Sequence, residues 1–284
     1  MNPFSPDLLR DKVIIVTGGA TGLGQAMSEQ FAELGAKLAI CGRRQTALDQ
    51  AAEVFRSKGQ DIYVQSCDVR DPVQVSEFVK AVYSHYGKVD ILVNNAAGNF
   101  ISPTERLSHR AVDSILGIVL HGTFYMTLEV GKQWIELRHP GTILNIVTTY
   151  ASTGSGYVTP SAAAKAGVLA LTRSLAVEWA PYGIRQVAIA PGAFPTDGAD
   201  SRLSPTPELQ QQLIDRIPIK RAGSKEELTH LAAFLISDYA GFINGEVITI
   251  DGGEWLQGAG QFNGLSEVTD EQWDELARMT RNGK

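Results

Sequence analysis

Residues 12–24, KVIIVTGGATGLG, decide the fold class of this sequence. The stretch begins with an apolar, β-branched run that is typical of a buried strand, and it leads into an amphipathic segment that ends near Leu34. Between the two, Gly18 permits a tight turn, Gly22 lets the backbone approach a pyrophosphate, and Gly24 lets a helix pack close to the strand. The helix N-terminus would then face the anion. We therefore predict a dinucleotide-binding site; the alternative is a tight turn without a ligand.

A second apolar run, residues 37–41, ends in Gly42, Arg43 and Arg44. A site for NAD usually carries Asp or Glu at this point, where the carboxylate binds the 2'-hydroxyl of the ribose. Two arginines without an acid fit the 2'-phosphate of NADP better. We predict NADP as the cofactor; the alternative is that both arginines are solvated charges at a helix start.

Polar residues follow the third strand-like run, residues 62–67. Asp68 can accept a hydrogen bond from the adenine amino group, and Arg70 is expected to be a free positive charge at the strand mouth. The fourth run, residues 91–93, leads into the small residues Asn94-Asn95-Ala96-Ala97-Gly98, against which a nucleotide can lie.

Strand-like and helix-like segments alternate along the whole chain. Further strands are expected at 143–147, 184–190 and 247–250, and helices at 72–86, 108–137, from about Pro160, and 224–237. This alternation predicts an α/β fold with one doubly wound, Rossmann-type parallel sheet of seven strands and helices on both faces. We expect one domain over residues 1–284, with a dinucleotide-binding core at 12–190, a substrate lid at 193–220 and a tail at 264–284 that holds one short helix.

Residues 150–165, YASTGSGYVTPSAAAK, carry a second group of reactive side chains. Tyr150 stands at the mouth of the strand at 143–147, where ligands of open α/β sheets bind. Ser161 and Lys165 are four residues apart and share one face of the following helix. A phenol, a hydroxyl and an amine are thus expected to converge on one site.

Composition narrows the classes of partner. The 284 residues carry a net charge of −6, which argues against nucleic acid or an anionic membrane. No apolar run approaches the roughly 20 residues of a membrane helix, so no membrane insertion is expected. Cys41 and Cys67 are expected to be buried free thiols, and no metal site is predicted. The N-terminus lacks the features of a signal or transit peptide, so we expect a cytoplasmic protein, or a mitochondrial one if a transit peptide has been removed.

The motifs TGGATGLG and NNAAG, the helix with Lys165, and the Pro191-Gly192 turn resemble those of the short-chain dehydrogenase/reductase family. The resemblance covers nearly the whole chain, with one departure. The family's Tyr-x-x-x-Lys pair would put Tyr at the position of Ser161, and Thr148 stands at the position of its usual Ser. An alcohol is a poor general acid for a ketone. Either the protein has lost catalytic activity, or another residue supplies the general acid. Tyr150 is the obvious candidate for that residue.

Within the family, four stretches are similar to the NADPH-dependent 2,4-dienoyl-CoA reductases of auxiliary fatty-acid β-oxidation: NNAAGNFISPTERLS, TYASTGSGYVTPSAAAKAG, SRLSPT and SDYAGFINGEVITIDGG. This resemblance implies that NADPH delivers hydride to the δ-carbon of a dienoyl thioester. Tyr150 and Asn99 would stabilise the thioester oxygen of the resulting dienolate, Ser161 would hold a water that protonates the α-carbon, and Lys165 would hold the nicotinamide ribose. The product would be a 3-enoyl-CoA.

The same resemblance implies the binding residues. Those for the cofactor are Gly18, Thr21, Gly22, Leu23, Gly24, Arg43, Arg44, Asp68, Asn95, Lys165, Pro191, Gly192, Ala193 and Phe194. Those for the substrate are Arg70, Phe100, Ser108 and Arg202, with the two arginines as partners of CoA phosphates. His121 stands where such relatives carry Asn and is interpreted as structural. A homotetramer is expected, packed through the helices at 108–137 and 160–180.

Two other functions stay open. The first is a ketoreductase of the same family, acting on a 3-oxoacyl substrate or as a sugar or alcohol dehydrogenase, in which Tyr150 or Tyr157 replaces the missing phenol. The second is a non-catalytic NADP-binding or redox-sensing protein, which the absence of the usual Tyr would favour.

Overall fold

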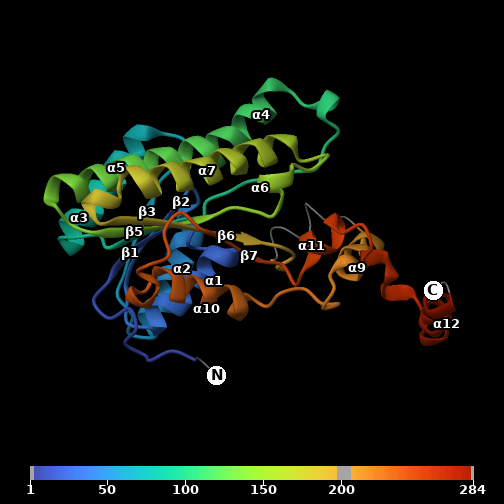
Figure 1. The fold of residues 1–284 in the computed structure, drawn as a ribbon. Helices are drawn as coiled ribbons and strands as arrows, with labels where there is room; N and C mark the ends of the chain where they lie inside the picture. The colour runs from blue at the N-terminus through green and yellow to red at the C-terminus, as the bar shows by residue number, and fades with distance from the viewer. Residues whose placement is uncertain (1–2, 197–205, 283–284) are drawn as a thin grey trace.

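A parallel sheet of seven strands, in the order β3-β2-β1-β4-β5-β6-β7, forms the centre of the computed structural model, which describes residues 3–196 and 206–282 (Figure 1). The strands are β1 Val13–Thr17, β2 Lys37–Gly42, β3 Ile62–Ser66, β4 Ile91–Asn94, β5 Gly141–Ile146, β6 Ile184–Pro191 and β7 Val247–Ile250. The strand order reverses between β1 and β4, which is where open α/β sheets bind ligands at their carboxyl edge. The predicted doubly wound parallel sheet of seven strands is confirmed.

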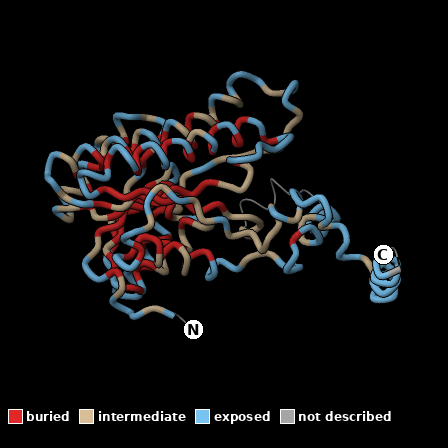
Figure 2. Tube along the Cα trace, viewed as in Figure 1, coloured by how far each residue is buried: buried red, intermediate tan, exposed pale blue. Residues whose placement is uncertain are grey.

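Helices cover both faces of the sheet (Figure 1). On one face lie α1 Gly22–Glu33, α2 Gln45–Ser57 and α10 Lys225–Ile236; on the other lie α3 Pro72–Tyr86, α4 His109–Leu116, α5 Gly122–Leu137 and α7 Thr159–Glu178. Each face has its own apolar core, and Figure 2 shows the buried residues concentrated between the strands and these helices. Cys41 and Cys67 are free and buried in the core on the α3 side, as predicted.

The predicted helical region at 108–137 is nearly continuous, but one turn of π-helix, Gly117–His121, joins α4 to α5. Gly122 lies so close to the chain after β3 that a Cβ there would be 2.6 Å from a methyl group of Val69. By length and composition the region His109–Leu137 would also suffice to cross a membrane. In the fold, however, α5 packs beside α3, and α4 packs beside α7, so this is the apolar helix of a layered core.

Four buried polar side chains cross the middle of the molecule. Asn94 at the end of β4 donates through Nδ2 to Thr127 Oγ1 (3.0 Å) on α5 and to Asn145 Oδ1 (2.9 Å) on β5. Asn145 in turn donates to Thr172 Oγ1 on α7 (2.9 Å). Asn94 and Asn145 are also direct partners in the pairing of β4 with β5. This ladder fixes the register of the two strands, since a slip would leave buried amides without partners.

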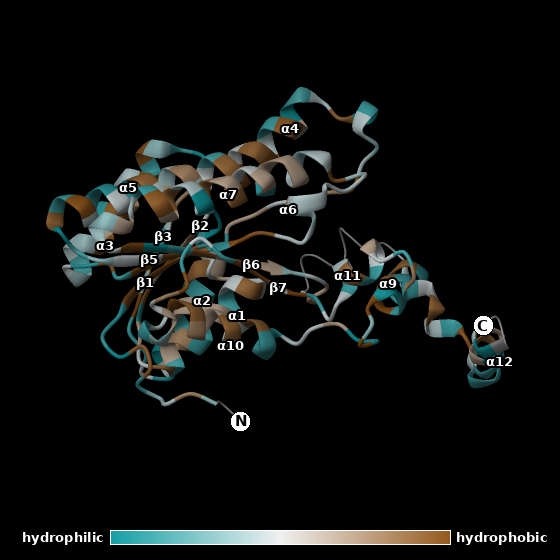
Figure 3. Ribbon diagram, viewed as in Figure 1, coloured by the Kyte–Doolittle hydropathy of each residue, from teal (hydrophilic) through white to brown (hydrophobic). Residues whose placement is uncertain are grey.

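Beyond the carboxyl end of the sheet the chain is mostly exposed. Here lie α9 Pro207–Arg216, α11 Glu254–Ala259 and α12 Asp270–Asn282 (Figures 1 and 2). The predicted tail helix is present as α12, and its hydropathy is mixed (Figure 3). Trp273, Leu276 and Met279 on this helix are all exposed. The expected lid, residues 193–220, lies partly outside the described residues. Arg202 belongs to the part that is not described.

Candidate active site

The glycine loop at the carboxyl end of β1 packs closely against β2 and against the loop after β4. Gly18 has φ +66°, in the left-handed region that favours glycine, and its N–H donates to Cys41 O (2.8 Å) on β2. A Cβ on Gly24 would lie 2.3 Å from Gly18 O and 2.4 Å from Asn95 Nδ2. The tight turn and the close helix–strand approach predicted for these two glycines are both present.

Thr17, which the sequence did not suggest, connects the glycine loop to the loop after β4. Its Oγ1 accepts from the backbone N–H groups of Asn95 and Ala96, both at 2.9 Å, and donates to Val93 O (3.3 Å). Asn95 Nδ2 donates to Thr17 O (3.0 Å). Asn95 therefore braces the loop on which the cofactor would lie. A hydroxyl at the last position of a buried strand, directly before the glycines, was the available sequence signal.

The N-terminus of α1 is suited to an anion. Thr21 is its N-cap without a side-chain cap hydrogen bond, and the first turn carries no acidic residue. Gly22 has φ +58°, and among the described residues a Cβ there would approach only Thr196, at 3.8 Å. The N–H groups of the first helical turn and the helix dipole favour an anion, so this helix end suits a pyrophosphate. Leu23 packs partly into the core on the α1 side.

Arg43 and Arg44 follow β2, and both are exposed. Arg43 lies close enough to Asp68 to help lower the pKa of that carboxyl group, although Arg70 contributes more. Two exposed guanidinium groups at the end of β2, one of them near the predicted adenine acceptor, are a chemically suitable setting for a 2'-phosphate. NADP therefore fits the residues present at the end of β2.

Arg70 is not the free charge that the sequence suggested. Its Nε donates to both carboxylate oxygens of Asp68, at 2.9 and 3.0 Å, and its Nη2 donates to Oδ2. The two residues carry opposite charges two positions apart, and the turn after β3 folds the guanidinium of Arg70 onto the carboxylate of Asp68. The hydrogen bonds from Arg70 are the largest cause of the lowered pKa of Asp68.

Asn99, Tyr150 and Ser161 meet in one hydrogen-bonded chain. Asn99 Nδ2 donates to the phenol oxygen of Tyr150 (3.3 Å), and that oxygen lies 3.1 Å from Ser161 Oγ. Tyr150 begins a short helix, α6 Tyr150–Thr153, that was not among the helices predicted from the sequence. Asn99 and Tyr150 come from neighbouring strands, and each lies five residues beyond a member of the buried ladder, Asn94 and Asn145 respectively.

Lys165 lies one turn along α7 from Ser161 and is buried. Its Nζ donates to the carbonyl oxygen of Ile146, the last residue of β5. Burial lowers the pKa of Lys165 to about 8. Nearby in sequence, the buried Thr148 Oγ1 has no hydrogen-bond partner among residues 3–196 and 206–282. Both groups have capacity to bind a ligand.

The residues predicted to hold substrate have different surroundings. Phe100 packs partly against the core on the α5 side. Ser108 Oγ accepts from Ala111 N (3.2 Å) and so caps α4, which leaves its hydroxyl proton for a ligand. His121 is exposed, and its ring centroid lies 6.1 Å from that of Tyr125. Within the described residues, no hydrogen bond joins His121 to Asn99, Tyr150 or Ser161.

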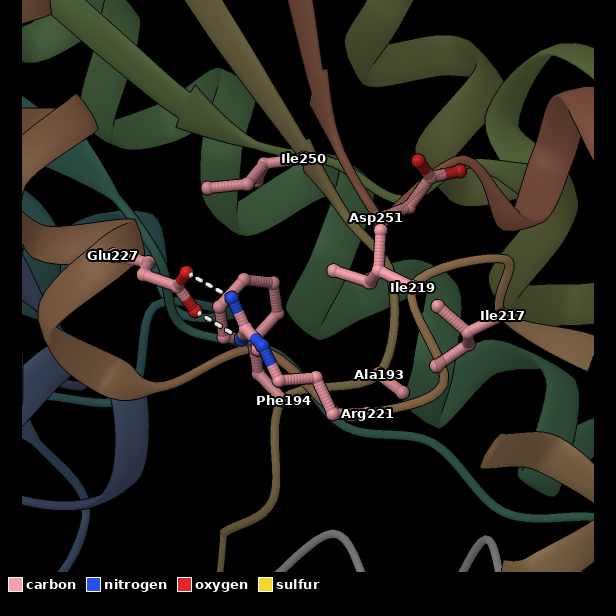
Figure 4. Close-up of a pocket in the computed structure, with 10 residues that line it drawn as sticks. Ala193, Phe194, Ile217, Ile219, Arg221, Glu227, Ile250 and Asp251 are labelled. Carbon is pink, nitrogen blue, oxygen red and sulfur yellow. Dashed lines mark hydrogen bonds and ion pairs between the residues drawn. The ribbon is translucent and has the colours of Figure 1, made fainter. Parts of the chain in front are cut away.

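The turn at residues 191–194 joins β6 to the expected lid. Gly192 N–H donates to Ile250 O and Gly223 N–H donates to Ala193 O, both at 2.9 Å. Phe194 packs against Gly223 and lines a small hollow beside Ile250 of β7 (Figure 4). A bidentate ion pair between Arg221 and Glu227, at 2.7 and 2.8 Å, closes one side of it. This hollow does not include Tyr150, so it lies apart from the hydrogen-bonded chain of Asn99, Tyr150 and Ser161.

Comparisons with known proteins give matches over most of the chain. Residues 18–254 match the profile of a family described as Enoyl-(Acyl carrier protein) reductase. A Bacillus subtilis protein named as a probable, (2E)-enoyl-CoA-producing 2,4-dienoyl-CoA reductase is 41% identical over 249 residues, which is 87% of this chain and 98% of the relative. A Caenorhabditis elegans protein named as a probable, (3E)-enoyl-CoA-producing 2,4-dienoyl-CoA reductase is 41% identical over 279 residues, 96% of this chain and 90% of the relative.

A solved structure is similar as well. The crystal structure of a short chain dehydrogenase from Bacillus anthracis superposes with a TM-score of 0.79 at 42% identity, and the match covers 86% of this chain and 96% of that one.

Proposed function

The chain belongs to the short-chain dehydrogenase/reductase family, and from that premise we propose that it is an NADPH-dependent oxidoreductase that reduces 2,4-dienoyl-CoA to 3-enoyl-CoA. The names of the two relatives support this substrate class. The reaction would serve the auxiliary steps of fatty-acid β-oxidation, in which conjugated double bonds must be removed from the acyl chain.

One observation carries the proposal: the phenol of Tyr150 lies next to the residue that stands at the family's usual Tyr position. The family's usual Tyr position holds Ser161, yet the phenol oxygen of Tyr150 lies 3.1 Å from Ser161 Oγ. Asn99 Nδ2 donates to this phenol oxygen, so an amide N–H donor lies beside the phenol O–H donor. Two neighbouring donors suit an oxygen that gains negative charge and is never itself protonated, as in a dienolate.

When bound, the nicotinamide supplies a hydride to the δ-carbon of the dienoyl thioester. The electron pair of the γ,δ double bond shifts through the conjugated system to the thioester oxygen. Tyr150 and Asn99 donate to that oxygen, and each donor contributes about 3 kcal/mol to transition-state stability. Ser161 holds a water that gives its proton to the α-carbon, while charged Lys165 hydrogen-bonds the ribose hydroxyls. The sum of one hydride and one proton reduces one carbon–carbon bond.

The preference for NADPH rests on the end of β2. Arg43 and Arg44 are exposed there, and the sequence offers no acid at the same point to bind a free 2'-hydroxyl. A phosphate dianion gains charge-assisted hydrogen bonds from two guanidinium groups, whereas a hydroxyl gains little from them.

The assay compares two thioesters with the same protein and NADPH. We expect oxidation of NADPH with trans,trans-2,4-hexadienoyl-CoA and little with acetoacetyl-CoA. Turnover of acetoacetyl-CoA alone would overturn the assignment. Because the two relatives are named for different products, the product is identified by NMR: protonation at the α-carbon gives the 3-enoyl thioester, and protonation at the γ-carbon gives the 2-enoyl thioester.

A ketoreductase is the second candidate, and Thr148 is the observation that favours it. Its buried, unpartnered hydroxyl stands at the family's usual Ser position, where it would bind a carbonyl oxygen beside Tyr150. The acetoacetyl-CoA measurement decides between the two, since this candidate requires the keto substrate to be the faster one.

We also propose a homotetramer located in the cytoplasm. Phe124 and Leu128 on α5, and Val177 on α7, are exposed apolar side chains that a second copy would cover. Light scattering after gel filtration tests the assembly, and fractionation of cells tests the location.

A further inference from the structure

We propose that Asp68 couples the two ligand sites: the adenine of NADPH takes Asp68 from Arg70, and the released guanidinium binds a phosphate of the acyl-CoA. The coupling rests on the proposed function, because it needs both an NADP site and a CoA thioester. It adds an order to the reaction, in which the cofactor prepares the enzyme for its substrate.

The first step is that Arg70 occupies most of the acceptor capacity of Asp68. Asp68 Oδ1 accepts from the Arg70 backbone N–H (3.1 Å) and Nε (2.9 Å), and its Oδ2 accepts from the same Nε (3.0 Å) and from Nη2. Three N–H groups of one residue thus bind a carboxylate that offers about four lone-pair sites. An adenine amino group that donates to Asp68 therefore competes with the guanidinium of Arg70 for the same two oxygens.

The second step is that Asp68 lies where the adenosine end of a dinucleotide must come. It follows β3 directly, its side chain is one-fifth exposed, and Arg43, the predicted partner of the 2'-phosphate, acts on its carboxyl group. The glycine loop is adjacent, since Gly18 N–H is bonded to Cys41 O on the strand between them. The adenine and Arg70 thus compete for one carboxylate.

The third step is that Arg70 can turn without disturbing the fold. Its side chain is 40% exposed. Its Cγ and Cδ lie 3.4 and 3.3 Å from the point where a Cβ on Gly117 would stand, so the stem rests on the first residue of the π-helical turn. The stem is held while the guanidinium can change partners at the solvent side.

The magnitude of the coupling follows from the exchange. An exposed ion pair contributes little net free energy, because solvent competes for both charges. The released guanidinium then gains a phosphate, which bears more negative charge than a carboxylate. We expect saturating cofactor to tighten acyl-CoA binding about threefold to tenfold, and by linkage acyl-CoA to tighten cofactor binding by the same factor.

Isothermal titration with trans,trans-2,4-hexadienoyl-CoA, with and without saturating NADP⁺, measures this factor. NADP⁺ has no hydride to give, so a ternary complex forms without turnover. In Asp68→Asn the guanidinium is never held, so acyl-CoA should bind tightly in both conditions and the coupling should fall to about onefold. The matched control is Arg56→Gln, which removes the same charge from α2 and should keep the full coupling.

Arg70→Gln provides a second, independent result. It should weaken acyl-CoA and remove the coupling, yet it should bind NADP⁺ as well as or better than the wild type, because Asp68 is free for adenine. A merely structural role for the pair would instead weaken NADP⁺ binding in this variant, and that result would overturn the proposal.

The same measurements distinguish an error in the proposed exchange at Asp68 from an error in the proposed dienoyl-CoA reductase activity. If hexadienoyl-CoA is reduced but binds equally with and without NADP⁺, the exchange is wrong and the activity stands. If hexadienoyl-CoA neither binds nor is reduced, both are wrong.

Discussion

The glycine-loop end of the site and the phenol end are built in different ways. At the glycine loop, the start of α1 lies against the Gly18 carbonyl and the Asn95 side chain, and a single added carbon on Gly24 has no room. At the phenol end, the side chains of Asn99, Tyr150 and Ser161 come from separate segments and hold one another by hydrogen bonds.

The two ends of the site should respond differently to substitution. A cofactor site that presents backbone N–H groups fails when its shape changes, because displaced N–H groups no longer converge on the phosphates. A reactive centre made of side chains can lose one polar atom and keep its shape. Substitutions at the first end should therefore damage folding and binding together, whereas those at the second should damage the chemical step alone.

Gly24→Ala should give the largest effect. The new Cβ would lie 2.3 Å from Gly18 O, so α1 must move. Overpacking of this kind costs about 1–3 kcal/mol of stability, and a shift of the phosphate cradle by about 1 Å should weaken NADPH binding by about 100-fold or more. Thermal unfolding and titration measure the two effects. Gly258→Ala, a helical glycine on α11 with open space around it, should change neither.

Tyr150→Phe tests the phenol end of the site. Loss of one donor to the developing oxyanion should lower kcat with hexadienoyl-CoA by about 100-fold. The NADPH dissociation constant and the unfolding temperature should hardly change, because the ring remains. Ser161→Ala should be milder in steady-state kinetics. If Ser161→Ala were the crippling change and Tyr150→Phe the mild one, the two roles would have to be exchanged.

Arg43→Ala should have an intermediate effect confined to the cofactor. A charged group that donates to a phosphate contributes about 1.5–3 kcal/mol, so NADPH binding should weaken by at least about tenfold. NADH lacks the 2'-phosphate and should be nearly unaffected. Fluorescence titration with both nicotinamides gives the ratio, and equal weakening of the two would contradict the 2'-phosphate role.

Raising the pH should produce the smallest change. Burial lowers the pKa of Lys165 to about 8, so the free enzyme loses this positive charge as the pH rises through that value. Only the charged form donates all its protons to the ribose hydroxyls. The NADPH dissociation constant should therefore rise about fourfold between about pH 7 and 8.5, as expected for a group that titrates near its pKa. A constant that is flat over this range would show that Lys165 stays charged.

The elements that the sequence predicted best are those with a strong local pattern. The strands are apolar runs bounded by glycine or polar residues, and α3 begins at Pro72 and ends at Tyr86, directly before Gly87, as expected of a helix between these two residues. The short helix α6 was not predicted, because four residues that include Ser and Thr beside glycines carry no helical pattern. The π-helical turn was also missed, since the apolar spacing runs through it.

At the site, the sequence identified side chains but not their partners. Tyr150, Ser161 and Asn99 were expected together and do meet. Arg70 was expected to be free, and only the turn after β3 shows that Asp68 binds it. Thr17 gave no sign of its role, because its hydroxyl bonds a loop that is more than 70 residues away in sequence. Contacts of this kind depend on the tertiary fold. The binding roles of the individual residues remain predictions.

The buried ladder between Asn94 and Asn145 has a consequence for how this enzyme can tolerate insertions and deletions. Both connections, from Asn94 to Asn99 and from Asn145 to Tyr150, advance by the same five residues from paired positions. A residue gained or lost in one connection would move only one of the two donors and separate them. Relatives that keep this pair of donors should thus vary the two connections in concert or not at all, while the exposed segments beyond β7 are free to change in length.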